Sequence, residues 1–312
     1  MDKWKRNKNV KYASVASTAK VWEVSERSVR NYCAQGRVPG SLISGKTWLV
    51  PKDAKKPERL VRHTLASKKQ TVLDILQREK DARLPGGMYH RVQIELTYNS
   101  NHIEGSRLSH DQTRYIFETH TIGITDKEIN VDDIVETANH FRCVDIAIDG
   151  AKSKLTESFI KQLHFVLKNG TSNSRKSWFK IGDYKILENE VGGISTAKPS
   201  EVKAKIKQLL LEYNEKKTLD FDDILDFHVR FERIHPFQDG NGRIGRLILF
   251  KECLKHNITP FIITEKLKHY YYRGINEWYS ERGFLRDTCL TAQDEFIKRF
   301  GVRENYKIEN LR

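Results

Sequence analysis

A short loop between two apolar helical stretches constrains the fold of this 312-residue chain more than any other segment. Pro236 disfavours a helical conformation at His235, so the preceding stretch, 221–234, must end there and leave the imidazole at the helix end. Gly240 and Gly242 allow backbone conformations that other residues avoid, and a second apolar helix follows them. The sequence therefore predicts a helix–loop–helix corner, with the unpaired N–H groups of the second helix facing the loop.

The start of that second helix has the composition of an anion site. Unpaired N–H groups at a helix N-terminus bind anions, and Arg243 and Arg246 add positive charge about one turn apart. Asp239 would repel a phosphate unless a divalent cation lay between them, and Mg²⁺ with a nucleotide fits best. With His235 as a general base, these are the parts needed to transfer a phosphate-containing group. The alternative is a capped corner with a solvated histidine and structural arginines.

Beyond residue 70 the chain is predicted to be helical almost throughout, because apolar side chains recur at helical spacing. The exception is the segment 177–196, which predicts a β-hairpin inserted among the helices. The fold class is therefore mostly α, a helical bundle with one hairpin. The predicted helices span 71–83, 88–99, 109–120, 131–149, 156–168, 200–216, 221–234, 243–255, 270–282 and 290–300.

The positive charge of the chain is concentrated near the N-terminus. The formal net charge is +14, but residues 1–70 contain 17 Lys and Arg against 5 Asp and Glu, a net charge of +12. The rest of the chain contains 38 basic and 36 acidic residues and is close to neutral. This asymmetry is typical of a nucleic-acid-binding module joined to a second domain.

The basic segment predicts two short helices, 14–22 and 26–35, followed by two strands, 41–43 and 47–50. Ser25 is a suitable N-cap for the second helix, and Gly36 ends it. Helix, turn, helix and hairpin describe a winged helix-turn-helix, and residues 1–57 resemble the excisionase or MerR-type DNA-binding module.

This resemblance implies a DNA partner. Four residues of the second helix then face the major groove, and two further basic residues meet phosphates. The alternative is a small protein-interaction module whose lysines provide solubility. The residues predicted to face the groove are Arg27, Ser28, Arg30 and Asn31, and those predicted to meet phosphates are Arg37 and Lys46.

Composition excludes several classes of protein. No apolar run is long enough for a transmembrane helix, and none follows the first residues as in a signal peptide. The four cysteines are far apart and lack the spacing of metal ligands. We therefore expect a cytoplasmic protein with reduced thiols and no membrane partner.

The sequence from His235 to Arg246 matches the motif of the Fic family, His-Pro-Phe-x-Asp/Glu-Gly-Asn-Gly-Arg-x-x-Arg, at every specified position. The resemblance extends over most of 85–302, preceded by a linker and connecting helix (58–84) and followed by a tail (303–312). Fic proteins mostly transfer AMP from ATP to a Ser, Thr or Tyr hydroxyl of a target protein. The resemblance therefore implies ATP as co-substrate, Mg²⁺ as metal and a protein target.

The resemblance also implies a role for each motif residue. His235 would deprotonate the target hydroxyl, and Asp239 would hold Mg²⁺. The intact Gly-Asn-Gly-Arg argues against the phosphorylating Doc branch, while transfer of another nucleotide or of phosphocholine stays an alternative. The α-phosphate would lie in an anion hole of Gly240, Asn241 and Gly242, with the β-phosphate on Arg243 and the γ-phosphate on Arg246.

A second motif, Ser100 to Gly105, resembles the Fic inhibitory pattern, Ser/Thr-x-x-x-Glu-Gly/Asn. The resemblance implies that Glu104 pairs with Arg246 and keeps the γ-phosphate from binding productively. Such competition is physically sound, because carboxylate and phosphate are both bidentate acceptors for one guanidinium. The alternative is an ordinary helix C-terminus capped by Gly105.

Further nucleotide contacts are implied by two weaker likenesses. The predicted hairpin matches the Fic flap in position, so that a target segment would add to it as a strand and Val191 would touch the adenine. Tyr272 would lie near the nucleotide, whereas core packing is preferred for Tyr271. Tyr279 stands where relatives often have Asn.

The sequence thus predicts an autoinhibited Fic adenylyltransferase with an N-terminal winged helix-turn-helix. One alternative is the reverse activity, a phosphodiesterase that removes AMP with the help of Glu104. Another is a DNA-binding regulator whose Fic body senses a nucleotide. A homodimer is compatible with the N-terminal module, because winged helix-turn-helix proteins often read paired half-sites.

Overall fold

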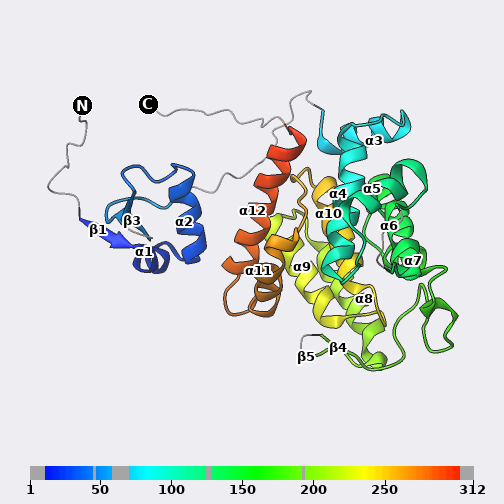
Figure 1. Ribbon diagram of the computed structural model, residues 1–312. Coiled ribbons are helices and arrows are strands. Elements are labelled where there is room, and N and C mark those ends of the chain that lie inside the picture. The colour runs from blue at the N-terminus through cyan, green and yellow to red at the C-terminus, as the bar shows by residue number, and fades with distance from the viewer. Residues whose placement is uncertain (1–10, 45–46, 58–69, 124–127, 192–193, 303–312) are drawn as a thin grey trace.

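A computed structural model describes residues 11–44, 47–57, 70–123, 128–191 and 194–302. They form a small N-terminal domain beside a larger helical body (Figure 1). The predicted fold class, mostly α with one hairpin in the body, is confirmed. Within these ranges no helix combines the length and apolar character needed to cross a membrane.

The N-terminal domain contains two helices and a three-stranded antiparallel sheet, in the strand order β1-β3-β2. Ser25 caps the second helix as predicted, its Oγ accepting from the Ser28 N–H at 3.2 Å. The strand β1 was not predicted; three residues are too few to show a period-2 pattern. The elements are β1 (Tyr12–Ser14), α1 (Val15–Trp22), α2 (Glu26–Ala34), β2 (Leu42–Ser44) and β3 (Thr47–Pro51).

The helical body contains the remaining elements. Each predicted helix has a counterpart, and two of them, α6 and α9, have the predicted bounds. The helices are α3 (Val72–Asp81), α4 (Met88–Ile103), α5 (His110–Thr119), α6 (Val131–Asp149), α7 (Glu157–Lys168), α8 (Pro199–Glu215), α9 (Phe221–Ile234), α10 (Asn241–Lys255), α11 (Glu265–Asn276) and α12 (Gly283–Phe300), with a 3-10 turn η1 (Asn173–Arg175) between α7 and α8.

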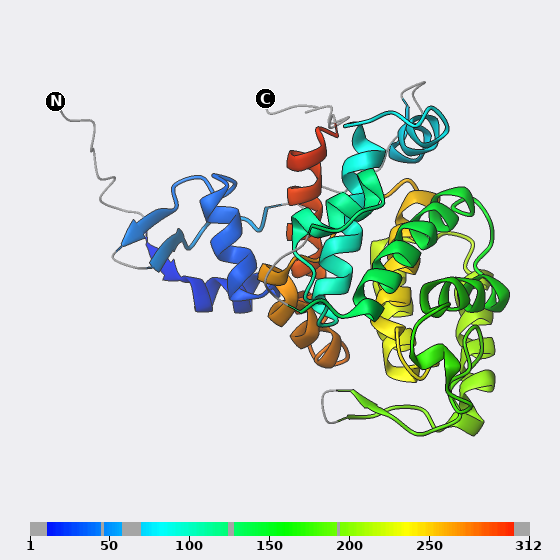
Figure 2. The same cartoon turned by 45° about the vertical axis from the view of Figure 1, so that its right-hand side comes forward.

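Four helix bounds differ from the prediction by more than two residues, and the hairpin is shorter than predicted. Helix α4 continues to Ile103, because Asn101 is buried and its amide donates to Thr137 Oγ1 at 3.2 Å. Helices α11 and α12 begin five and seven residues before the predicted starts, and α11 ends at Asn276, six residues before the predicted end. The hairpin contains only β4 (Glu190–Val191) and β5 (Ile194–Ser195), at one end of the body (Figure 2).

Helix α10 lies at the centre of the body. Every residue from Asn241 to Leu254 is buried, and the helix contacts α3, α4, α6, α7 and α9. A helix that is buried on all sides can carry apolar residues all round. The N-terminus of α10, which starts at the predicted corner, is therefore fixed by the packing of the whole bundle.

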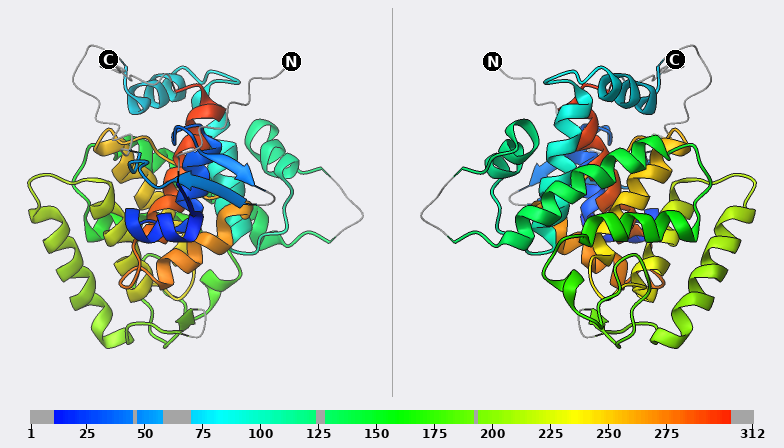
Figure 3. Two further views of the ribbon diagram at one scale, coloured as in Figure 1. Left: turned by 90° about the vertical axis from the view of Figure 1, so that its left-hand side faces the viewer. Right: turned by 90° about the vertical axis from the view of Figure 1, so that its right-hand side faces the viewer.

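The N-terminal domain lies against the outer side of α11 and α12 (Figure 3). It has its own core, in which the described apolar side chains of both helices meet Val50 of the sheet. Its contacts with the body are made mainly by α2.

Candidate functional site

The predicted corner is present. Helix α9 ends at Ile234, and His235 takes a left-handed conformation with φ of 50° as the C-cap. Phe237 is fully buried and stacks on His164, with ring centroids 3.9 Å apart. This packing anchors the loop to α7.

Asn241 closes the loop. Its side-chain oxygen accepts from the Phe237 N–H at 2.8 Å, and its amide donates to the Phe237 carbonyl at 2.8 Å. The amide is therefore used within the loop, and only the backbone N–H of Asn241 is available to a phosphate. The first backbone bond of the new helix is made by Ile244, so the N–H groups of residues 241–243 precede it, as at other helix N-termini.

His235 has the protonation state that a general base requires. Burial lowers the pKa of His235 to about 4, so the imidazole is neutral near pH 7. Its Nδ1 lies 3.3 Å from the Glu232 carbonyl oxygen, which favours a proton on Nδ1. The lone pair on Nε2 is then free to accept a proton.

Glu104 and Arg246 form an ion pair, as the inhibitory motif implies. Arg246 Nη2 lies 2.8 Å from Glu104 Oε1, and the guanidinium also donates to the Ser100 side chain at 3.0 Å and to its carbonyl at 2.9 Å. The carboxylate fits against Gly242, where a Cβ would come within 2.3 Å of Oε1. Although burial alone would raise it, the charges of Arg246 and Arg243 lower the pKa of Glu104, which keeps it ionised.

Two residues that sequence reasoning missed complete a charge ring around the other motif arginine. Lys168 at the end of α7 donates to Asp239 Oδ2 at 2.5 Å and to Glu136 on α6. Glu136 in turn accepts from Arg243, whose Nη2 lies 3.6 Å from Asp239 Oδ1. We call Asp239, Lys168, Glu136 and Arg243 the charge ring.

Asp239 is the most solvent-exposed member of the charge ring. Its side chain is 42% exposed, whereas Lys168 is 1% exposed. Burial alone would raise the pKa of Asp239, but Arg243 and Lys168 lower it to about 2. In the described part of the chain no group of three or more His, Cys, Asp or Glu could hold a metal by itself. Asp239 fits Mg²⁺ in the way usual for nucleotide sites, with one carboxylate and the phosphates as ligands.

The tyrosines follow the sequence interpretation in part. Tyr271 is buried in the core, and its hydroxyl lies 2.6 Å from His228 Nε2. Tyr272 is partly buried near the Glu104–Arg246 pair, and burial, followed by the Glu104 charge, raises its pKa. Val191 lies in β4, one strand of the short hairpin.

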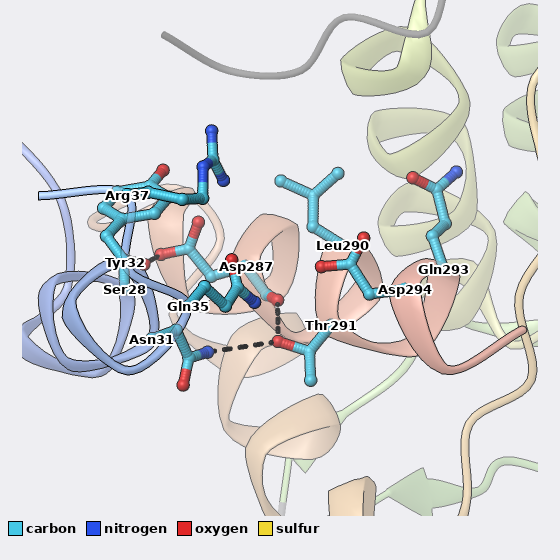
Figure 4. Close-up of a pocket in the computed structure, with 10 residues that line it drawn as sticks. All are labelled: Ser28, Asn31, Tyr32, Gln35, Arg37, Asp287, Leu290, Thr291, Gln293 and Asp294. Atoms are coloured by element: carbon cyan, nitrogen blue, oxygen red, sulfur yellow. Dashed lines mark hydrogen bonds between the residues drawn. The ribbon is translucent and has the colours of Figure 1, made fainter. Parts of the chain in front are cut away.

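The helix predicted to enter DNA packs on the body instead of facing outward. Ser25 Oγ donates to Asp287 Oδ2 at 3.0 Å, and Ser28 donates to the same oxygen (Figure 4 shows this pocket). Asn31 Nδ2 lies 3.4 Å from Thr291 Oγ1. In this arrangement α2 can enter a major groove only if it leaves α12.

The remaining residues of the DNA prediction are placed as follows. The Arg27 guanidinium stacks over Tyr270 at 3.7 Å, which is also a contact with the body. Arg30 pairs with Glu26 at 3.1 Å and is exposed. Arg37 lies over the Tyr32 ring. Lys46 lies outside the described residues.

A protein-family model matches the part of the chain that contains this corner. Residues 154–252 match the model of the Fic/DOC family. The protein adenylyltransferase Fic of Aedes aegypti is 26% identical over 231 residues, which are 70% of this chain and 42% of that protein. The protein adenylyltransferase fic-1 of Caenorhabditis elegans is 25% identical over 184 residues, 57% of this chain and 35% of that protein. The chain thus spans less than half the length of these curated relatives.

Solved structures show the same fold. A Fic domain-containing signalling protein from Bacteroides thetaiotaomicron superposes with a TM-score of 0.56 at 27% identity, covering 73% of this chain and 89% of that one. Fic-1 from C. elegans superposes with a TM-score of 0.56 at 19% identity, covering 73% and 71%, and shares the fold. The match to the Fic/DOC family model covers residues 154–252, and the corner between His235 and Arg246 lies within these residues.

Proposed function

We propose that the chain is a protein adenylyltransferase, which transfers AMP from ATP to a Ser, Thr or Tyr hydroxyl of a target protein. The observation that carries this proposal is the corner itself, where a neutral His235 stands beside a buried helix N-terminus and two arginines. The names of the relatives, which are protein adenylyltransferases, support it.

In the proposed reaction His235 Nε2 accepts the proton of the target hydroxyl as its oxygen attacks the α-phosphorus. The N–H groups at the start of α10 stabilise the charge on the α-phosphate, and Arg243 and Arg246 hold the leaving pyrophosphate. Mg²⁺ on Asp239 would supply further neutralisation of the phosphates. The flap formed by β4 and β5 would pair with an extended segment of the target.

We further propose that Glu104 inhibits this activity. The Glu104–Arg246 pair supports the idea, because the carboxylate and the two Ser100 groups occupy Nε and Nη2 of Arg246, and a γ-phosphate would have to displace them to bind in a bidentate way. Glu104 belongs to the same chain, so the inhibition needs no separate protein.

The test uses purified protein with Mg²⁺ and labelled ATP. Wild type should label itself weakly, Glu104→Gly should label itself strongly, and Glu104→Gly combined with His235→Ala should not label itself. Glu118→Gly, on the exposed side of α5, is the control for a glutamate-to-glycine change far from the site. If Glu104→Gly gains nothing while wild type removes AMP from a modified substrate, the phosphodiesterase is the correct function.

A second proposal concerns the N-terminal domain, which we propose binds DNA. The net charge of +12 in residues 1–70 and the helix–turn–helix with hairpin support it, and the proposal requires α2 to leave its contacts with α12 when DNA binds. Anisotropy of a labelled DNA duplex should report salt-sensitive binding that is lost when residues 1–60 are deleted. ATP-dependent binding without any labelling would favour the nucleotide-sensing regulator instead.

Two smaller proposals accompany these. A homodimer on paired half-sites would show as a two-to-one complex in sedimentation with the same duplex, whereas one-to-one binding would refute it. We place the protein in the cytoplasm, in keeping with its four cysteines, which are buried free thiols.

A further inference from the structure

Lys168 is the one cation of the charge ring that the catalytic motif does not include. Lys168 is not part of the loop, yet its ammonium is almost fully buried and donates to Asp239, the carboxylate that we propose as the metal ligand. An ammonium is costly to bury unless it is paired. The two carboxylates of Asp239 and Glu136 meet that requirement together.

The two partners of Lys168 are not equivalent. Glu136 is 13% exposed and is held from its other oxygen by Arg243, so it stays in place without Asp239. Asp239 is 42% exposed, so a cation from solvent can reach its carboxylate. Lys168 can therefore keep a buried partner when Asp239 is taken by another cation.

Charge balance limits when that exchange can happen. The charge ring holds two cations and two anions and is neutral. A divalent cation on Asp239 would leave two excess positive charges beside Lys168 and Arg243, which is unfavourable in a partly buried site. The phosphates of a bound nucleotide supply the missing negative charge.

We propose that Lys168 is the resident counter-ion of Asp239 and competes with the divalent cation for this carboxylate, so that metal binds together with nucleotide and poorly without it. The proposal deepens the proposed function and rests on it in one respect, the use of Asp239 as the metal ligand. Lys168 acts here as a positioning residue through Asp239.

The test measures binding of Mn²⁺ alone to the nucleotide-free protein, from the loss of the free-ion electron paramagnetic resonance signal. Lys168→Met removes the charge while filling a similar volume, and should tighten Mn²⁺ binding about tenfold, because a like charge is removed from beside the ligand. Lys168→Arg should bind as weakly as wild type. Lys168→Gln, which can still hydrogen-bond both carboxylates, serves as a second neutral variant if Lys168→Met does not fold.

Two controls locate the effect. Lys161→Met removes a lysine from the same helix that pairs with Glu157 and Asp183, away from the charge ring, and should change nothing. In an Asp239→Ala background the gain from Lys168→Met should disappear. A gain that persists there, or Lys168→Met binding Mn²⁺ no more tightly than wild type, would overturn the proposal.

Adding ADP separates this proposal from the proposed function. ADP should tighten Mn²⁺ binding of wild type more than that of Lys168→Met, because the nucleotide offsets a charge that the variant lacks. If ADP has no effect on any variant, the nucleotide site is wrong, while the Mn²⁺-only comparison still decides the role of Lys168.

Discussion

Glu232 is a carboxyl group that folding should keep protonated at neutral pH. It lies on the last turn of α9, and its Oε1 is buried without a hydrogen-bond partner among the described residues. The carboxyl lies against Gly245 of α10, where a Cβ would come within 2.2 Å of Oε1. Burial raises the pKa of Glu232 from 4.5 to about 8, despite the opposing charge of Arg246.

This shift has a definite sign and size. The folded state holds its proton more tightly than the unfolded chain, so stability is lost as pH rises from about 4.5 to about 8. With these pKa values the cost to the free energy of unfolding is about 1 kcal/mol at pH 5 and about 4 kcal/mol at pH 8. Glu232→Gln removes this dependence, because an amide does not ionise in this range.

The assay is urea denaturation of wild type and Glu232→Gln at pH 5, 6.5 and 8, followed by fluorescence. The stability of the variant relative to wild type should rise by about 3 kcal/mol from pH 5 to pH 8. The buried histidines titrate equally in both proteins and cancel in this difference. Glu295→Gln, an exposed position on α12, should show no such rise.

A flat difference would refute the reasoning. It would mean that the Glu232 carboxylate is ionised in the folded protein, with Arg246 as its partner. Arg246 Nη1 has no hydrogen-bond partner among the described residues, so this outcome is structurally distinct and informative.

Further predictions concern the catalytic corner. The rate of self-labelling by Glu104→Gly should not depend on His235 ionisation above about pH 5 and should fall toward pH 4, since the pKa of His235 is about 4. A half-maximal rate near pH 6.5 would contradict this. Phe237→Ala should lower the free energy of unfolding by about 3–5 kcal/mol in urea titrations, because it empties a fully buried site; a loss under 1 kcal/mol would show that the loop collapses to fill it. Asn241→Ala should cost about 1–3 kcal/mol and reduce labelling, because the Phe237 N–H and carbonyl lose their partner; labelling at the wild-type rate would show that the loop holds its shape without it. Ser25→Ala should destabilise the N-terminal domain by about 1 kcal/mol through loss of the α2 cap, and unchanged melting of that domain would refute this.

Local structure could be predicted from the sequence where a capping residue or a proline marks the end of a helix. The bounds of α9 were predictable because Asp220 caps its start and Pro236 enforces its end. The predicted end of α4 was too early, because Ser100 and Asn101 resemble a polar helix terminus, although both are buried in the structure. The unpredicted extension places Ser100 on the last turn of α4 and makes Glu104 the C-cap of that helix.

Contacts between residues far apart in the chain could not be predicted from the sequence. Glu136 and Lys168 are polar residues on amphipathic helices, where the expected position is the solvated face, and only tertiary packing brings them to Asp239. The docking of α2 on α12 depends on side chains about 260 residues apart. Neither set of contacts produces a periodic pattern or a motif that can be recognised in one amino-acid sequence.

The burial of α10 has a consequence for how this site can evolve. The N–H groups that we propose to face the phosphates lie at the N-terminus of a helix packed along its whole length, so their position depends on side chains as far as Leu254, near the other end of α10. A substitution deep in the core can therefore shift the reacting geometry without touching any motif residue. We expect the rate of the proposed reaction to respond to core packing, and changes that tune it to be better tolerated in the hairpin of β4 and β5 than in the helices packed on α10.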